Sequence, residues 1–253
     1  MQPANNGQNL FLQRAAVECA EGERCEAGAC VSDIIKAGVL PVAIEYMDRM
    51  CIEVCEAHAR AGYPMCEALL IVEVEGAPSE IDEQLALIKG IAAKHKPVAY
   101  REAQDADDAG RIWLGRKSAF GAMGQVNDYM CLDGTVPVSK LPEVLRRIGE
   151  LSKEYGLDVG NVFHAGDGNF HMTFMVDPDK PEEMATAKEL AHEMNRRALR
   201  FDGTCTGEHG VGIGKQKYMA EEHGEGWSVM ADIKRALDPN NILNPGKVIP
   251  AAD

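Results

Sequence analysis

A hairpin signal in the second half of the chain constrains the fold most. Apolar and β-branched residues lie on both sides of Asp167-Gly168 within residues 158–176, and this dipeptide is typical of a two-residue type I′ turn between antiparallel strands. With that turn, His164 would lie directly opposite His171. Opposed side chains on one face have Cβ atoms about 4.5–5.5 Å apart. The signal therefore predicts an antiparallel sheet that carries two neighbouring imidazoles.

Helix and strand patterns alternate along the rest of the chain. They predict an α+β fold, in which helices cover one face of a mainly antiparallel, ferredoxin-like sheet and a helical segment follows at the C-terminus. Asp48 stands in an N-cap position, and Ser79-x-x-Asp82 has the capping-box pattern. The expected helices cover 26–37, 48–61, 79–94, 141–155, 181–200 and 225–236, and the expected strands outside the hairpin cover 41–46, 69–74, 97–101 and 127–137.

A second glycine-rich segment, residues 203–212, places an acid next to a histidine. Glu208 and His209 are adjacent, and neighbouring side chains in extended or irregular backbone point in different directions. One of the two can bind a metal while the other handles a proton. Two His and one carboxylate with open coordination positions form a site that can hold a substrate as well as a metal.

The histidine pair also has a purely structural interpretation. His164 and His171 can form an ordinary cross-strand pair, or be core histidines whose polar atoms are satisfied. Their combination with the Glu208-His209 dipeptide, each element embedded among glycines in a chain with seven His, favours a metal-binding or catalytic role.

Three segments resemble one enzyme family. They are residues 161–171, 203–215 and 237–247, the last ending in Ile242-Leu243-Asn244-Pro245-Gly246-Lys247. Together they are similar to the C-terminal half of FAD-linked 2-hydroxy acid dehydrogenases of the vanillyl-alcohol oxidase superfamily, which include the flavin subunit of glycolate oxidase and the D-lactate dehydrogenases. Weaker resemblance reaches 112–117 and 41–48. The resemblance implies oxidation of a small 2-hydroxy acid, of glycolate or D-lactate type, to the 2-oxo acid, with hydride transfer to FAD.

The resemblance also implies a catalytic centre. His164, His171 and Glu208 match the ligands of a divalent metal, which is zinc, iron or manganese across the family. His209 matches the general base that removes the hydroxyl proton. Arg116 matches a residue that holds the substrate carboxylate, where its planar guanidinium gives bidentate recognition. From the residues alone, Arg116 could instead form a surface salt bridge on a basic helix face.

Other matched positions concern the cofactor and the substrate. Asn169 and Asn244 match cofactor-binding positions, the second in a tail that returns toward the flavin. Thr173 stands where some relatives carry Asn, and Phe120 and Cys131 replace the Thr and Lys that bind the second carboxylate of hydroxyglutarate. A monocarboxylate substrate is therefore expected.

The domain organisation follows from the same resemblance. Family members precede this region with a flavin-binding domain, and that N-terminal FAD-binding domain is expected to be absent here. We expect a loose leader at 1–25, the FAD-linked oxidase C-terminal domain at 26–221, and a helix and tail at 222–253 that would return to a flavin domain. A separate FAD-binding chain and an iron-sulfur electron-acceptor subunit are the expected protein partners. An uncovered flavin-facing surface should also favour self-association.

The charge and hydropathy of the chain exclude other classes of function. A net charge of -14 argues against non-specific nucleic-acid binding, which requires basic surface. The polar residues 1–6 lack the order of a signal peptide, and no apolar run reaches the roughly 18 residues of a membrane span. We therefore expect a cytoplasmic protein without a nucleic-acid partner.

Two other functions fit the same residues. A stand-alone metallohydrolase would use metal-bound water, with His209 as proton shuttle, and would hydrolyse its substrate without flavin. A non-catalytic cap, from a truncated gene product or one half of a split enzyme, would keep the fold without activity in isolation. A flavin-binding chain encoded next to this one would favour the split form.

Overall fold

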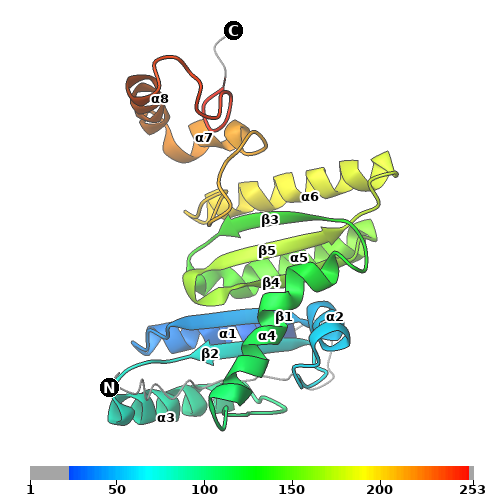
Figure 1. The fold of residues 1–253 in the computed structure, drawn as a ribbon, viewed down its shortest axis with the longest axis vertical. Coiled ribbons are helices and arrows are strands. Elements are labelled where there is room, and N and C mark those ends of the chain that lie inside the picture. The colour runs from blue at the N-terminus through cyan, green and yellow to red at the C-terminus, as the bar shows by residue number, and fades with distance from the viewer. Residues whose placement is uncertain (1–22, 251–253) are drawn as a thin grey trace.

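The central element of the fold is a five-stranded antiparallel sheet with the strand order β2-β1-β4-β5-β3 (Figure 1). The computed structural model describes residues 23–250. The expected α+β class is confirmed, as is the hairpin within 158–176. The strands are β1 (Ala43–Asp48), β2 (Ala68–Glu73), β3 (Tyr129–Thr135), β4 (Val159–His164) and β5 (Asn169–Met175).

Helices connect most of these strands. Each of the six expected helices is present, and α5 and α6 have the predicted bounds. Asp48 caps α2, where its Oδ1 accepts the Cys51 amide at 3.2 Å. Two further helices, α4 and α7, lie outside the expected ranges. The helices are α1 (Glu23–Lys36), α2 (Arg49–Ala59), α3 (Pro78–Lys94), α4 (Ala106–Met123), α5 (Leu141–Tyr155), α6 (Pro181–Arg200), α7 (Gln216–His223) and α8 (Gly226–Leu237).

Two local predictions around α3 were wrong. The helix begins at Pro78, whose fixed φ suits a first helical position, and Glu80 Oε2 accepts the amide of Ala77 at 2.9 Å. The proposed capping residues at 79 and 82 therefore lie inside the helix. The strand expected at 97–101 does not form beyond a single bridge residue. Val98 there is 46% exposed, so the segment lacks the buried face that would hold it in the sheet.

Alternation along the strands separates two hydrophobic cores. The larger core lies between one face of the sheet and α1, α3, α5 and α6, and takes strand residues such as Tyr46, Leu70, Leu132, Phe163 and Phe170. The smaller core lies on the opposite face beneath α2 and α4, and takes Met47, Leu69, Ile71 and Val162. Helices thus cover one face as expected, and α2 and α4 cover part of the other.

The turn between β4 and β5 differs from the predicted type I′ turn. A type I′ turn requires positive φ at both central residues, but only Gly168 has it, at 74°. The connection is instead a 3-10 turn at Ala165–Asp167 (η2), closed by the Gly168 amide, which donates to the Ala165 carbonyl at 3.1 Å. A side chain at Gly168 would also collide with the backbone of Val136.

This turn changes the register of the hairpin. Asn161 lies opposite Met172, which brings Val162 rather than His164 opposite His171, so the predicted pairing of the two histidines was wrong. The shift is two residues. Because side chains alternate with a period of two, both histidines still lie on the same face, as diagonal neighbours whose ring centroids are 6.1 Å apart.

The C-terminal helices α7 and α8 lie beyond the edge of the sheet, where α7 contacts α6 and α8 contacts α7 (Figure 1). The tail after α8 has no regular structure, as predicted. It is held by Asp238, which accepts the amides of Ile242 and Leu243 at 3.0 and 2.9 Å. No helix within residues 23–250 has the length and apolar character needed to cross a membrane.

The expected leader is only partly visible. Residues 23–25 belong to α1, and the rest of the range 1–25 lies outside the described residues.

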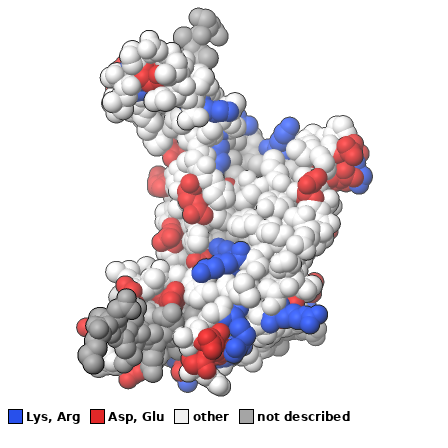
Figure 2. All heavy atoms as spheres, in the orientation of Figure 1, with Lys and Arg blue, Asp and Glu red and all other residues white. Residues whose placement is uncertain are grey.

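On the face shown in Figure 2, Lys and Arg side chains occur in separate small groups among Asp and Glu, and they form no continuous basic surface there.

Candidate functional site

Four charged or imidazole side chains meet on the sheet face that carries the smaller core. Glu45 of β1 lies opposite His164 of β4, and Asp133 of β3 lies opposite His171 of β5. Their sequence neighbours on each strand point into the larger core. Because strand side chains alternate between faces, all four of these groups lie on the other face. Pairing of four strands therefore assembles the site.

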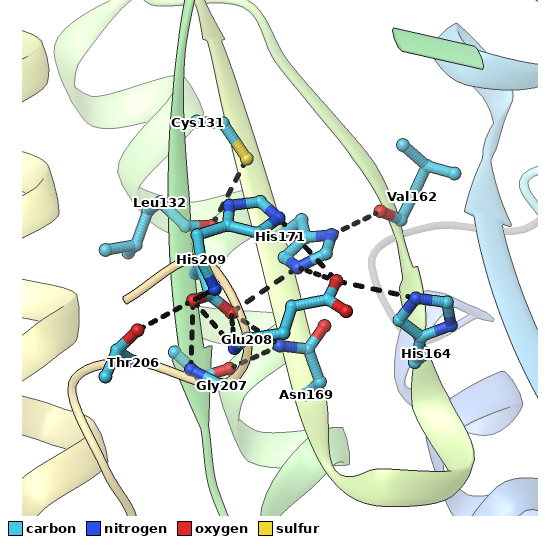
Figure 3. Close-up of polar contacts among 12 residues, drawn as sticks. Cys131, Leu132, Val162, His164, Asn169, His171, Thr206, Gly207, Glu208 and His209 are labelled. Carbon is cyan, nitrogen blue, oxygen red and sulfur yellow. Dashed lines mark hydrogen bonds and ion pairs between the residues drawn. The ribbon is translucent and has the colours of Figure 1, made fainter. Parts of the chain in front are cut away.

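Glu208 completes the cluster from the loop before α7 (Figure 3). Its Oε1 lies 3.4 Å from His164 Nε2, 3.3 Å from His171 Nε2 and 3.6 Å from His209 Nε2. In a tetrahedral metal site with metal–ligand bonds of about 2.1 Å, two ligand atoms lie about 3.4 Å apart. Glu208 Oε1 thus lies at a ligand-to-ligand distance from each of the two predicted histidine ligands, His164 and His171.

The hydrogen bonding of His171 also favours a cation. Its Nδ1 lies 3.2 Å from the Val162 carbonyl oxygen, so Nδ1 donates to that carbonyl and Nε2 points into the cluster. Nε2 is buried, and no hydrogen bond within the described part of the chain reaches it. Two carboxylate oxygens face Nε2, Glu208 Oε1 at 3.3 Å and Asp133 Oδ1 at 3.4 Å, so a proton on Nε2 or a bound cation must lie between these groups. A divalent metal with nitrogen and oxygen ligands fits this donor set.

A second set of possible ligand atoms overlaps the first. Asp133, His171 and His209 offer ligand atoms that all lie within 4.8 Å of one another. His209 is 44% exposed at its side chain, and its ring stacks on that of His171 with centroids 4.6 Å apart. His209 thus lies at the open side of the cluster, where it can reach a bound molecule.

Arg116 and Glu45 form a buried ion pair behind His164. Arg116 Nη2 and Nε lie 2.8 and 2.9 Å from Glu45 Oε2, and Glu45 Oε1 lies 2.7 Å from His164 Nδ1. Arg116 is 7% exposed and Glu45 2%. The hydrogen bond with Glu45 raises the pKa of His164 above its ordinary value, although burial acts against it.

This arrangement gives Glu45 and Arg116 distinct roles. A carboxylate that accepts from Nδ1 of a histidine orients Nε2 toward a metal, and Glu45 is placed to do this for His164. Arg116, predicted to hold the substrate carboxylate, uses Nε and Nη2 on Glu45. Among the described residues, no protein group pairs with Nη1 of Arg116. Only this part of the guanidinium can therefore reach a substrate.

Asp133 is the most heavily hydrogen-bonded carboxylate of the site. It accepts from the backbone amides of Gly207, Glu208 and His209 and from side chains of Thr206, Asn169 and Lys215. Burial raises its pKa, but the neighbouring His171, these amides and the Lys215 charge together hold the pKa of the Asp133 carboxyl well below its usual range. The carboxylate is therefore charged and anchors the loop.

The two predicted cofactor residues lie in different surroundings. Asn169 is buried on the same face as His171, and its Nδ2 donates to Asp133 Oδ1 at 2.8 Å. Asn244 is exposed in the tail with φ at 49°, where its carbonyl accepts the Lys247 amide. No contact among the described residues joins Asn244 to the cluster.

The side of the cluster beyond His171 is largely apolar. The Phe120 ring lies 5.8 Å from the His171 ring and 6.2 Å from that of Tyr129. Thr173 pairs with Cys131 across β5 and β3, and burial raises the pKa of the Cys131 thiol to about 12. None of these four neighbours carries a charge that could neutralise a second substrate carboxylate.

Sequence reasoning missed Glu45 and Asp133. Each is a buried acid within a strand whose neighbours are mostly apolar, and fully buried acids are rare unless they are paired. A buried acid among apolar strand residues was therefore the signal that the sequence offered. The role of such an acid depends on its partners, which come from segments distant in sequence.

Comparisons with known proteins agree with this architecture. A family model described as FAD linked oxidases, C-terminal domain, matches residues 16–248. Glycolate oxidase subunit GlcD of Escherichia coli (strain K12) is 41% identical over 228 residues, which cover 89% of this chain and 46% of that protein. The mitochondrial D-lactate dehydrogenase (cytochrome) of Arabidopsis thaliana is 37% identical over 85% of this chain and 38% of its own length. The chain spans less than half the length of these two relatives.

A solved structure shows the same fold. The 4-ethylphenol oxidase from Gulosibacter chungangensis superposes with a TM-score of 0.67 at 13% sequence identity, over 97% of this chain and 54% of that chain. At that identity the likeness concerns the fold alone.

Proposed function

The chain belongs to the family of FAD linked oxidases, C-terminal domain, and we propose that it supplies the substrate-binding and metal-binding half of an enzyme that oxidises a small 2-hydroxy acid. The observation that carries the proposal is the convergence of three imidazole Nε2 atoms on one Glu208 oxygen at 3.3–3.6 Å. Its relatives named glycolate oxidase subunit GlcD and D-lactate dehydrogenase support a hydroxy acid substrate.

Each residue of the cluster has a chemical task in this proposal. His164, His171 and Glu208 would hold a divalent metal, zinc, iron or manganese, which lowers the pKa of a bound hydroxyl. His209 removes the hydroxyl proton, because an imidazole has a pKa near neutrality and its ring lies at the open side of the cluster. Arg116 binds the substrate carboxylate through the part of its guanidinium that Glu45 does not use. FAD, when bound, would accept the hydride from C2.

The proposed substrate is a monocarboxylate of glycolate or D-lactate type. The uncharged wall of Phe120, Tyr129, Cys131 and Thr173 beside His171 can accommodate a hydrogen or a methyl group. A second carboxylate there would lose its hydration without gaining a cation, which costs several kcal/mol in order of magnitude.

Calorimetric titration of the zinc-loaded chain tests this function without any flavin. We expect glycolate and D-lactate to bind the zinc-loaded chain at least about tenfold more tightly than D-2-hydroxyglutarate, because only the dicarboxylate leaves a charge unpaired. The same titration of the metal-free chain is the control and should show little binding. Equal binding with and without zinc, or tighter binding of the dicarboxylate, would contradict the proposal. Flavin-independent hydrolysis of test esters would favour the hydrolase alternative instead.

The remaining assignments extend the same proposal. We place the substrate and metal site in residues 26–221, and assign 222–253, including Asn244, to contact with a flavin-binding region. A separate FAD-binding chain and an iron-sulfur acceptor subunit are the proposed protein partners, in the cytoplasm. Val229, Ile233 and Leu237 lie four residues apart on α8 and are more than half exposed, which supports a docking role for this end of the chain.

A further inference from the structure

We propose that Asp133 is the positioning residue of the site, which fixes the backbone that carries Glu208 and His209, and that it is not a metal ligand. No residue of the predicted ligand set performs this task. The inference rests on the proposed function for the identity of the bound group, but the hydrogen bonds that carry it belong to the chain alone.

Consecutive donors of one loop converge on a single carboxylate oxygen. Asp133 Oδ2 lies 3.0 Å from Thr206 Oγ1 and from the Gly207 amide, 3.1 Å from the Glu208 amide and 2.8 Å from the His209 amide. Successive backbone N–H groups that point inward form an anion-binding concavity. Here a carboxylate from β3 of the same chain fills it.

The loop is held to β3 by further contacts. Thr135 and Thr204 exchange two backbone hydrogen bonds of 3.1 and 2.9 Å, and Lys215 Nζ donates to the Asp133 carbonyl at 2.8 Å. A Cβ on Gly207 would lie 2.7 Å from Asp133 Oδ1, closer than real Cβ contacts. Glycine at 207 therefore lets the loop backbone approach the carboxylate closely.

The same contacts argue against Asp133 as a ligand. A metal ligand must direct a lone pair to the ion, and each carboxylate oxygen has about two lone-pair sites. Oδ2 already receives four donors of the loop. Oδ1 receives Asn169 Nδ2 at 2.8 Å and the Glu208 amide at 3.3 Å, and it lies 3.4 Å from His171 Nε2. Glu208, by contrast, accepts no described hydrogen bond of this kind and directs Oε1 at the three imidazoles (Figure 3).

The consequence is a coupling between ligand and base. Because adjacent amides of Glu208 and His209 bind the same oxygen, one contact sets the direction of both side chains. Residues that orient metal ligands typically contribute about 10- to 100-fold to metal affinity. Loss of the Asp133 charge should therefore loosen the loop and weaken metal binding, while the ligand set of any metal that still binds stays the same.

The test uses the full chain, with cobalt(II) as the metal probe, and compares Asp133→Asn with the wild type. Asp128→Asn, the same change at an exposed position just before β3, is the matched control. Absorption titration gives the cobalt Kd and the visible spectrum, and amide hydrogen exchange of the metal-free chain reports on residues 206–209. We expect Asp133→Asn to raise the Kd at least about tenfold, to speed exchange in the loop at least about tenfold, and to keep the band positions at saturating cobalt.

Several outcomes would overturn the inference. Unchanged Kd and exchange in Asp133→Asn would show that the loop does not depend on this carboxylate, and shifted cobalt bands would make Asp133 a ligand. If the wild type binds no cobalt, the proposed metal function fails, and the exchange rates alone decide whether Asp133 holds the loop. If Asp133→Asn does not fold, Thr206→Val decides, since it removes one loop donor. A several-fold higher Kd with faster exchange supports the inference, and wild-type values contradict it.

Discussion

His209→Ala is expected to lower turnover of glycolate or D-lactate about 10²- to 10⁴-fold, the contribution typical of a general base, while the bound metal stays in place. The reason lies in the position of the ring. It is half exposed, stacks on His171, and is the imidazole at the open side of the cluster. The measurement is dye reduction by the substrate in a preparation that combines the chain with a flavin-binding half, with metal determined in the same samples.

His58→Ala is the matched control for this variant, because the His58 side chain is exposed on α2 and is not one of the residues that form the site. It should keep both turnover and metal. Unchanged turnover in His209→Ala would rule out its role as the base. Loss of metal together with turnover would instead make His209 a ligand, in the alternative set with Asp133 and His171.

Glu45→Ala should lower the free energy of unfolding by about 3–5 kcal/mol, the cost of leaving one partner of a buried ion pair uncompensated. Arg116 is 7% exposed, and its Nε and Nη2 both depend on Glu45 Oε2. Removal of the carboxylate would also take the acceptor from His164 Nδ1. Denaturant unfolding followed by circular dichroism gives the change.

Two further variants separate the buried pair from a general effect of truncation. Glu193→Ala removes a carboxylate that lies 2.9 Å from Arg147 in a part-exposed pair, and it should cost less than about 1 kcal/mol. Glu45→Ala combined with Arg116→Met should recover part of the lost stability, because it removes the unpaired charge. A Glu45→Ala variant no less stable than Glu193→Ala would contradict this account of the site.

Local sequence patterns predicted much of the fold. Helices α5 and α6 have the predicted bounds, since apolar periodicity and a first-turn proline mark both. The prediction of a strand at 97–101 was wrong because its residues alone do not show whether the segment pairs with the sheet. The capping box at 79 and 82 failed because Pro78 starts the helix earlier.

The candidate site was predicted only in part, because it also depends on contacts between distant segments. The predicted register of the hairpin was wrong by two residues. The turn type depends on the φ of Asp167, and no sequence pattern fixes that angle. An even shift keeps both histidines on one face, so the error in register leaves their proposed role as ligands a prediction still to be tested. Glu45 and Asp133 were missed because their partners, His164 and the loop at 206–209, are reached only through strand pairing over long sequence separations.

Elemental analysis of the purified wild-type chain beside His164→Ala tests the central claim most directly. After saturation with zinc and dialysis, we expect near-stoichiometric metal per chain in the wild type and in His58→Ala. We expect a large loss in His164→Ala, because Nε2 of His164 lies 3.4 Å from the Glu208 oxygen that would share the ion. No retained metal in the wild type, or stoichiometric metal in His164→Ala, would contradict the metal centre proposed for this fold.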